Sequence, residues 1–207
     1  MPKSLLLLID LQAAFCDEGG SIGRQGRDIA PLAAAARQCQ RLAEAAWKHR
    51  VPVAWTRMML RPDYSDGGTL LALRPNLARI GALRAGTPDV AFSALVQPRP
   101  DDLVIDKPRY SSLYATALEA QMRALRIERV VVGGVTTSMC VETTVRDLSQ
   151  RDYDVVVARE ACADFDAERH RASMDAMEFG FSRLVGTGDD ERELADIGPV
   201  ASHAEAN

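Results

Sequence analysis

The chain has 207 residues, of which 47% are hydrophobic, and a formal net charge of −4 at pH 7. This length favours a single domain over residues 1–207 with one substantial core, and the lack of excess basic residues argues against nucleic acid as a partner. The apolar run Leu5–Ile9 is too short to cross a membrane and lacks a small-residue cleavage pattern, so neither a membrane partner nor a secretory signal is expected.

Apolar runs alternate with segments of helical periodicity along most of the chain. Strands are predicted at residues 5–9, 51–56, 102–106, 130–132, 154–158 and 181–185. Helices are predicted at residues 29–47, 92–96, 116–125, 137–148 and 167–179. The alternation predicts an α/β fold: a three-layer, doubly wound, mostly parallel six-stranded sheet with helices on both faces.

Residues 58–86 interrupt this alternation with Pro, Gly, Asp and Arg. Long irregular segments in compact domains are usually functional or disordered, so we expect an insertion that shapes the mouth of a pocket, alone or with a neighbouring subunit. A solvated charged face is the alternative. Residues 188–207, rich in Asp, Glu and Ala, are predicted to form a peripheral helical tail with frayed ends.

The four cysteines, Cys16, Cys39, Cys140 and Cys162, are irregularly spaced and include no CxxC pair. Such usage is typical of reduced thiols and favours a cytoplasmic location over a disulfide framework.

Cys140 follows an apolar strand and two glycines, and Thr137 and Ser138 are predicted N-cap residues of the next helix. The thiol then lies in the first helical turn, where free N–H groups and the helix dipole favour thiolate and lower the pKa from about 8.5. The same N–H groups suit an oxyanion. The alternative is that Cys140 is a small buried hydrophobe.

Two other predicted strands end at charged residues, Asp10 and Lys107. The carboxyl ends of parallel strands line one crevice, where ligands normally bind. Considered alone, Asp10 would be interpreted as a helix or loop capping residue after a strand, and Lys107 as a solvated surface amine before Pro108. Together with Cys140 they predict a site that combines an acid, an amine and a thiol.

Three ordered blocks carry a family resemblance: residues 9–12 with Phe15, residues 107–111, and residues 134–147. They resemble the isochorismatase-like cysteine hydrolases, a family that includes nicotinamidase, N-carbamoylsarcosine amidase, biuret hydrolase and ureidoacrylate amidohydrolase. Residues 107–111 and 64–68 look most like the ureidoacrylate amidohydrolase branch.

The resemblance implies a catalytic triad of Asp10, Lys107 and Cys140. It also implies a cis peptide before Thr136 and an oxyanion hole made by the backbone N–H groups of Thr136 and Cys140. Relatives are usually dimers or tetramers, so a homo-oligomer is expected. Glu160 stands where relatives commonly have Asp after the fifth strand.

These residue types predict a cysteine-dependent amidohydrolase that cleaves a C–N bond of a small amide, ureide or carbamoyl compound. The thiolate of Cys140 adds to the carbonyl, and the resulting thioester is hydrolysed, releasing ammonia or an amine or carbamate. Asp10 carries the proton in each step, and Lys107 supplies positive charge that keeps Asp10 and Cys140 ionised.

Predicted substrate contacts follow the same strands. They are Gln12, Phe15, Tyr110 and Val135, with Trp55 or Tyr64 as further wall residues and Arg109 and Ser111 as further polar contacts. Aromatic residues after a strand are more often core packing, which is the alternative for Phe15 and Tyr110.

No metal or other cofactor is expected. The region Trp55–Leu60 lacks the Asp-x-His pair with which some relatives bind a divalent ion, and the three histidines, His49, His170 and His203, are predicted away from the crevice. Gly133 and Gly134 lack the spacing of a dinucleotide-binding motif.

Other functions remain open. A nicotinamidase is disfavoured by the missing metal ligands, and an isochorismatase by Cys140, because vinyl ether hydrolysis needs no thiol. A non-catalytic binding protein would need no nucleophile at all. A redox sensor based on Cys140 would need a resolving thiol, for which Cys162 is the candidate.

Overall fold

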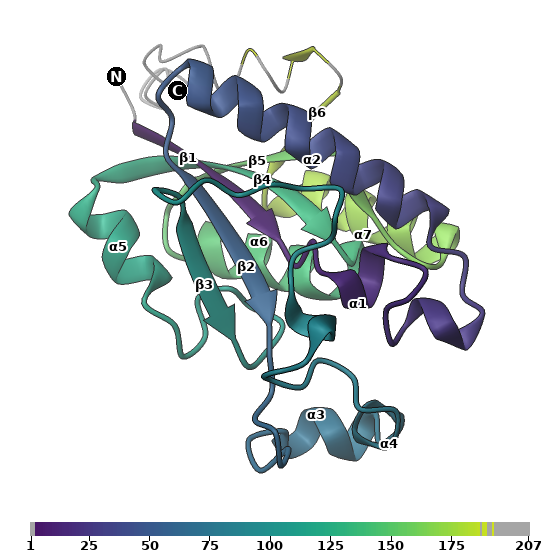
Figure 1. Cartoon of the computed structure of the whole chain (residues 1–207). Coiled ribbons are helices and arrows are strands. Elements are labelled where there is room, and N and C mark those ends of the chain that lie inside the picture. The colour runs from purple at the N-terminus through teal and green to yellow at the C-terminus, as the bar shows by residue number, and fades with distance from the viewer. Residues whose placement is uncertain (1–2, 187, 190–191, 193–207) are drawn as a thin grey trace.

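The computed structural model describes residues 3–186, 188, 189 and 192. A six-stranded sheet with strand order β3-β2-β1-β4-β5-β6 forms its centre, and every neighbouring pair is parallel (Figure 1). The strands are β1 (Lys3–Ile9), β2 (Val53–Met58), β3 (Leu103–Lys107), β4 (Ile127–Val135), β5 (Asp154–Ala163) and β6 (Arg183–Val185). The predicted doubly wound fold is confirmed.

Helices cover both faces of the sheet (Figure 1). The long helix α2 (Ala30–Lys48) packs across β1, β2, β4 and β5. The opposite face carries α5 (Leu118–Ala124), α6 (Glu142–Ser149) and α7 (Ala167–Gly180). Because both faces are covered, the central strands are apolar along nearly their whole length instead of alternating. Leu5 to Ile9 in β1 and Val130 to Val132 in β4 are all fully buried.

The strand order reverses between β1 and β4, which makes their carboxyl ends the topological switch point where open α/β sheets bind ligands. Gly134 allows the two strands to approach there. Its φ is +135°, and a Cβ atom at this position would lie 2.2 Å from the carbonyl oxygen of Ile9. A side chain at residue 134 would therefore push β4 away from the point where β1 delivers Asp10.

Shorter elements surround this edge. They are α1 (Ala13–Cys16), η1 (Gly23–Gln25), α3 (Gly68–Leu73), α4 (Asn76–Arg79), η2 (Pro88–Val90) and the single π-helical turn η3 (Thr137–Val141). The segment 58–86 thus contains two short helices, α3 and α4, where the sequence predicted no regular pattern.

Two other expectations need correction. Residues 92–96 form turns instead of a helix, because Phe92 bridges to Gln12 and the Ser93 backbone N–H donates to Leu11, which holds this segment against the chain after β1. Strand β5 continues to Ala163, five residues beyond the predicted end. Most of the predicted 188–207 tail lies outside the described residues, and no helix within the described part is long and apolar enough to cross a membrane.

Candidate active site

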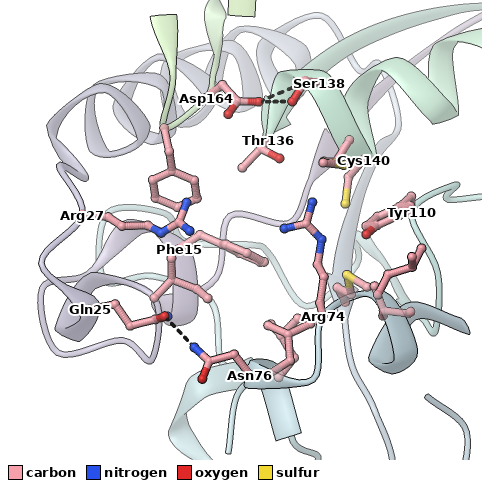
Figure 2. A pocket seen from close by; sticks show the side chains of 18 of the residues that line it. Phe15, Gln25, Arg27, Arg74, Asn76, Tyr110, Thr136, Ser138, Cys140 and Asp164 are labelled. Carbon is pink, nitrogen blue, oxygen red and sulfur yellow. Dashed lines mark hydrogen bonds between the residues drawn. The ribbon is translucent and has the colours of Figure 1, made fainter. Parts of the chain in front are cut away.

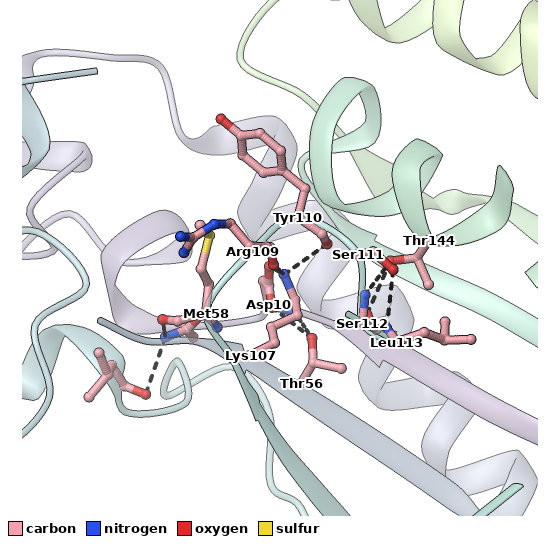
Figure 3. A network of polar contacts seen from close by, with 12 residues as sticks. Asp10, Thr56, Met58, Lys107, Arg109, Tyr110, Ser111, Ser112, Leu113 and Thr144 are labelled. Atoms are coloured by element: carbon pink, nitrogen blue, oxygen red, sulfur yellow. Dashed lines mark hydrogen bonds and ion pairs between the residues drawn. The ribbon is translucent and has the colours of Figure 1, made fainter. Parts of the chain in front are cut away.

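A buried ion pair lies at the switch point. Asp10 directly follows β1 with a left-handed φ of 56°, and Lys107 is the last residue of β3. Lys107 Nζ lies 2.7 Å from Asp10 Oδ2, and both side chains are completely buried. The Thr56 hydroxyl on β2 donates to Asp10 Oδ1 at 2.6 Å (Figure 3). Three adjacent strands therefore hold one carboxylate in place.

The loop after β3 completes the surroundings of Lys107. Its Nζ donates to the backbone carbonyls of Arg109 and Tyr110 at 3.0 and 3.1 Å (Figure 3). With Asp10 these give the ammonium three oxygen neighbours, which matches its three N–H donors. Burial disfavours the charge, but the neighbouring Asp10 carboxylate outweighs this and raises the pKa of Lys107. The amine is therefore a fixed cation.

Cys140 lies in η3, the turn that follows β4, and its thiol makes side-chain contacts with both Asp10 and Lys107. Burial, followed by the nearby Asp10, raises the pKa of the thiol, although Lys107 acts in the opposite direction. The predicted lowering of this pKa is wrong, because desolvation outweighs the positive charges around the sulfur. The resting thiol at neutral pH is protonated.

Asp10 offers that proton an acceptor. Its Oδ1 accepts from the Thr56 hydroxyl, and its Oδ2 lies 2.7 Å from Lys107 Nζ as a buried ion pair. The Cys140 thiol also contacts this carboxylate, which is the basic group beside the sulfur.

The turn that carries Cys140 is anchored from β5 and α7. Ser138 donates to Asp164 Oδ2 through its backbone N–H at 2.9 Å and its hydroxyl at 2.6 Å. Thr137 Oγ1 lies 2.8 Å from His170 Nδ1. The peptide bond between Val135 and Thr136 is cis. Residues 137 and 138 thus bind neighbouring elements, and neither caps a helix as the sequence predicted.

The same contacts correct two further expectations. Glu160 lies within β5, and the residue that follows the strand is Asp164, adjacent to the Cys140 turn because Val135 pairs with Ala163. His170 is half-buried against this turn instead of lying on a helix surface away from the site. His49 is exposed at the end of α2, and His203 lies outside the described residues.

A cavity of about 410 Å³ opens over the Cys140 turn (Figure 2). Four of the predicted site residues line it: Phe15, Tyr110, Thr136 and Cys140. Asp10 and Lys107 lie behind Cys140 and do not line it. The sulfur is therefore the group of the buried trio that a small molecule meets first.

The outer wall of the cavity comes from the insertion. Leu70, Leu73, Leu77 and Ile80, on or beside α3 and α4, supply apolar surface. Asn76 Nδ2 donates to Gln25 Oε1 of η1 at 3.1 Å, so the insertion meets the loop after β1 across the mouth (Figure 2).

Several predicted substrate contacts have structural roles instead. The Gln12 amide is fully buried, accepts from the Met58 N–H and donates to the carbonyls of Met58 and Val90, which ties β1 to β2 and η2. Val135 is also buried and does not line the cavity. The other four predicted contacts donate hydrogen bonds within the protein. Trp55 donates to the Asp102 carboxylate and Tyr64 to the Ala82 carbonyl. Arg109 donates to the Asp66 carbonyl and Ser111 to the Asp147 carboxylate.

Sequence reasoning missed the charged residues that line the cavity, namely Arg27, Arg74, Asp164 and Arg169. Asp164 was detectable in principle, because a carboxylate commonly follows a strand at the ligand edge. The prediction ended β5 at residue 158 because Arg159 and Glu160 come next, but both are exposed while the strand continues. Arg27 and Arg74 belong to loops and Arg169 to the first turn of α7, and no periodicity marks them.

A second cavity, of about 630 Å³, lies at the opposite edge of the sheet. Trp47, Arg99 and Asp102 help to line it, and the Asp102 carboxylate accepts from the indoles of Trp47 and Trp55. Although this cavity is larger, no cysteine lines it and it lies away from the buried Asp10 and Lys107 pair, so we place the candidate site at Cys140. Among the described residues, no group of three or more His, Cys, Asp or Glu side chains is arranged to hold a metal ion.

Comparison with known proteins shows the family and the fold of this chain. Residues 4–189 match the isochorismatase domain family. A ureidoacrylate amidohydrolase, RutB of Methylorubrum extorquens, is 30% identical over 197 residues, which cover 89% of this chain and 76% of that protein. A cysteine hydrolase from Pseudomonas syringae pv. phaseolicola 1448A superposes with a TM-score of 0.85 and 28% identity over 93% of this chain and 92% of its own.

The N-carbamoylsarcosine amidase of Thermoplasma acidophilum has the same fold, with a TM-score of 0.70 and 21% identity over 88% of this chain and 95% of its own.

Proposed function

This chain belongs to the isochorismatase family, and we propose that it is a cysteine-dependent amidohydrolase that cleaves a small amide, ureide or carbamoyl compound through a thioester. Its relatives place it among hydrolases of carbon–nitrogen bonds. The nucleophile and the intermediate are our addition. The observation that carries them is the contact of the Cys140 thiol with the buried Asp10 and Lys107 pair at the wall of a cavity.

The first half of the proposed reaction starts from the protonated thiol. As the sulfur of Cys140 adds to the substrate carbonyl carbon, its proton moves to the Asp10 carboxylate, which the thiol contacts. The backbone N–H groups of Thr136 and Cys140 are the proposed donors to the oxyanion. The C–N bond then breaks, Asp10 returns the proton to the departing nitrogen, and ammonia or an amine leaves.

The second half regenerates the thiol. Water attacks the acyl carbon, Asp10 accepts the proton of that water, and the C–S bond breaks with the proton returning to sulfur. If the substrate is a ureide and ammonia leaves in the first half, the product of the second half is a carbamate. Lys107 stays charged throughout and stabilises the carboxylate and the sulfur that loses its proton.

The wider setting is proposed on the same basis. The partner is a small amide or ureide, and the four free cysteines support a reducing, cytoplasmic location. A redox sensor is less well supported, because burial raises the pKa of Cys140 and raises that of Cys162 to about 12, and reactive sensor thiols have low pKa values. A homo-oligomer, dimer or tetramer, remains our expectation from the family resemblance.

The test is ammonia release over a panel of ureides, carbamoyl compounds and simple amides, with acid quenching and mass spectrometry of the intact protein. We expect turnover of at least one compound and an acyl adduct on Cys140 in the quenched wild type. The Cys140→Ala variant should lose about 10³-fold or more in kcat.

Cys162→Ala is the matched control, since Cys162 is also buried near the end of a strand but does not line the cavity. It should retain wild-type turnover and adduct. Unchanged turnover by Cys140→Ala, or an adduct on another residue, would contradict the proposal.

A further inference from the structure

Thr144 and Asp147 connect the two segments that carry the proposed reaction. Both lie on α6, which continues directly from the turn that holds Cys140. They come four and seven residues after Cys140, spacings that return to the same side of a helix. That side faces the loop after β3, whose backbone carbonyls at 109 and 110 accept from Lys107.

Hydrogen bonds from two consecutive serines hold this loop to α6. The Ser112 backbone N–H donates to Thr144 Oγ1 at 3.0 Å, and the Ser112 hydroxyl lies 3.1 Å from the same oxygen (Figure 3). The Ser111 hydroxyl donates to the Asp147 carboxylate and accepts from the Leu113 backbone N–H at 3.1 Å. Both serines and Thr144 are buried, so water offers these groups no substitute partner.

The loop depends on this support because residues 108–117 form neither helix nor strand. Its carbonyls at 109 and 110 nevertheless lie only 3.0 and 3.1 Å from the Nζ atom of Lys107, whose side chain is completely buried. Hydrogen-bond acceptors favour the charged form of a buried amine, whereas desolvation disfavours it. A displaced loop would therefore weaken the stabilisation of the ammonium.

We propose that Thr144 and Asp147 are positioning residues, which act through the loop after β3 to keep the Lys107 ammonium among its oxygen neighbours beside Cys140. This inference rests on the proposed function, which gives Lys107 its role in the reaction. Neither Thr144 nor Asp147 lines the cavity, so both act through other residues. One helix thereby places the nucleophile and the cation relative to each other.

The charge of Lys107 reports on this arrangement. The titratable groups that face it are Asp10, after β1, and Cys140, in η3. The substitutions below change neither of them. Weaker hydrogen bonds to the two carbonyls should lower the pKa of Lys107, and a misplaced cation should lower kcat.

NMR of protein labelled with ¹³C at the lysine ε carbons measures this pKa directly. The chain contains three lysines, of which Lys3 and Lys48 are exposed. Lys3→Arg and Lys48→Arg each remove one signal, so the remaining signal belongs to Lys107. Titration toward high pH then shows where Lys107 begins to lose its proton, and this measurement needs no substrate.

Thr144→Val and Thr144→Ser form the first pair of variants. Valine keeps the shape of the side chain but removes the oxygen that accepts from Ser112, whereas serine keeps the oxygen and removes a methyl group. We expect Thr144→Val to lower the pKa of Lys107 by about one pH unit and kcat about tenfold, and Thr144→Ser to stay close to the wild type. If Thr144 only packed α6, serine would be the more harmful substitution.

Asp147→Ala tests the same role at a partly exposed side chain, where a failure to fold is less of a concern. It should change the pKa of Lys107 and kcat in the same direction as Thr144→Val. Ser111→Ala should reproduce its effect, because each variant removes one end of the same hydrogen bond. Arg151→Gln is the matched control, since it removes the exposed ion-pair partner of Asp147 and should behave as the wild type.

The outcomes separate this inference from the proposed function. A wild-type pKa of Lys107 in folded Thr144→Val and Asp147→Ala would overturn the positioning role, even if kcat fell, and would leave the hydrolase intact. A lowered pKa in these variants without turnover of any amide or ureide by the wild type would support the hold on Lys107 and refute the proposed hydrolysis. An unchanged pKa together with no turnover would overturn both.

Discussion

The two halves of the cavity are built in different ways. The inner half, with Asp10, Lys107 and Cys140, stands on the ends of three parallel strands and is almost completely buried. The outer half comprises residues 59–86 and the loop after β1. It consists of short helices and loops with exposed arginines, and few hydrogen bonds connect these two segments with each other or with their surroundings. The difference suggests that the reaction depends on the rigid core, whereas the choice of substrate depends on parts that can vary without disturbing it.

In the inner half, the largest effect is expected from Lys107→Met, which leaves the Asp10 carboxylate buried without its cation. We expect the free energy of unfolding to fall by about 3–5 kcal/mol and kcat to fall by about 10³-fold. Denaturant titration and ammonia release measure the two effects. The double variant Asp10→Asn/Lys107→Met removes both charges, so it should recover most of the stability but none of the activity. If the single variant were as stable as the wild type, the ion pair would have no structural role.

A smaller effect is expected where the inner half meets β5. Asp164→Asn weakens two hydrogen bonds that hold Ser138 in the turn before Cys140. We expect kcat to fall about 10- to 100-fold, because hydrogen bonds to a charged group contribute about 1.5–3 kcal/mol and the turn carries the proposed oxyanion donors. Ser138→Ala removes only the hydroxyl donor and should cost less. Steady-state kinetics of both variants tests this ranking of the two falls in kcat. A larger fall in kcat for Ser138→Ala than for Asp164→Asn would contradict it.

The outer half should respond in KM instead. The Asp89 carboxylate accepts from the Ser21 backbone N–H and hydroxyl and from the Leu83 backbone N–H, at 2.7 to 2.8 Å, and so joins the loop after β1 to the insertion. Asp89→Asn should raise KM severalfold, leave kcat nearly unchanged and speed amide hydrogen exchange around residue 83. Asp175→Asn, an exposed carboxylate on α7, is the control. An equal fall in kcat would show that the two halves are not separable.

How far the sequence predicts each half follows from the same contrast. Asp10, Lys107 and Cys140 were found because apolar runs mark buried strands, and parallel strands deliver their carboxyl ends to one edge. The six-stranded sheet followed from the same pattern. Arg27 and Arg74 were missed because an exposed arginine in a short helix or loop leaves no periodic signal.

Other errors arose where long-range contacts override local preference. Gln12 looked like a substrate contact, but its amide is consumed by backbone groups from residues 58 and 90, which no local pattern reveals. Thr137 and Ser138 have the composition of helix caps, yet His170 and Asp164 bind them instead. The pKa of Cys140 was misjudged because its burial depends on the whole fold.

The smallest expected effect concerns pH and the contact between Thr137 and His170. Burial lowers the pKa of His170 below its ordinary value of 6.5, with Asp164 opposing and Arg159 assisting the shift. As the pH falls below about 6.5, the unfolded chain therefore binds more protons at this histidine than the folded protein does. The free energy of unfolding decreases through this range. Denaturant titrations should show wild-type stability declining there more steeply than that of His170→Asn, in which an amide can still reach Thr137. Parallel pH profiles would mean that the pKa of His170 is the same in the folded and unfolded protein, which would contradict the lowering that burial predicts.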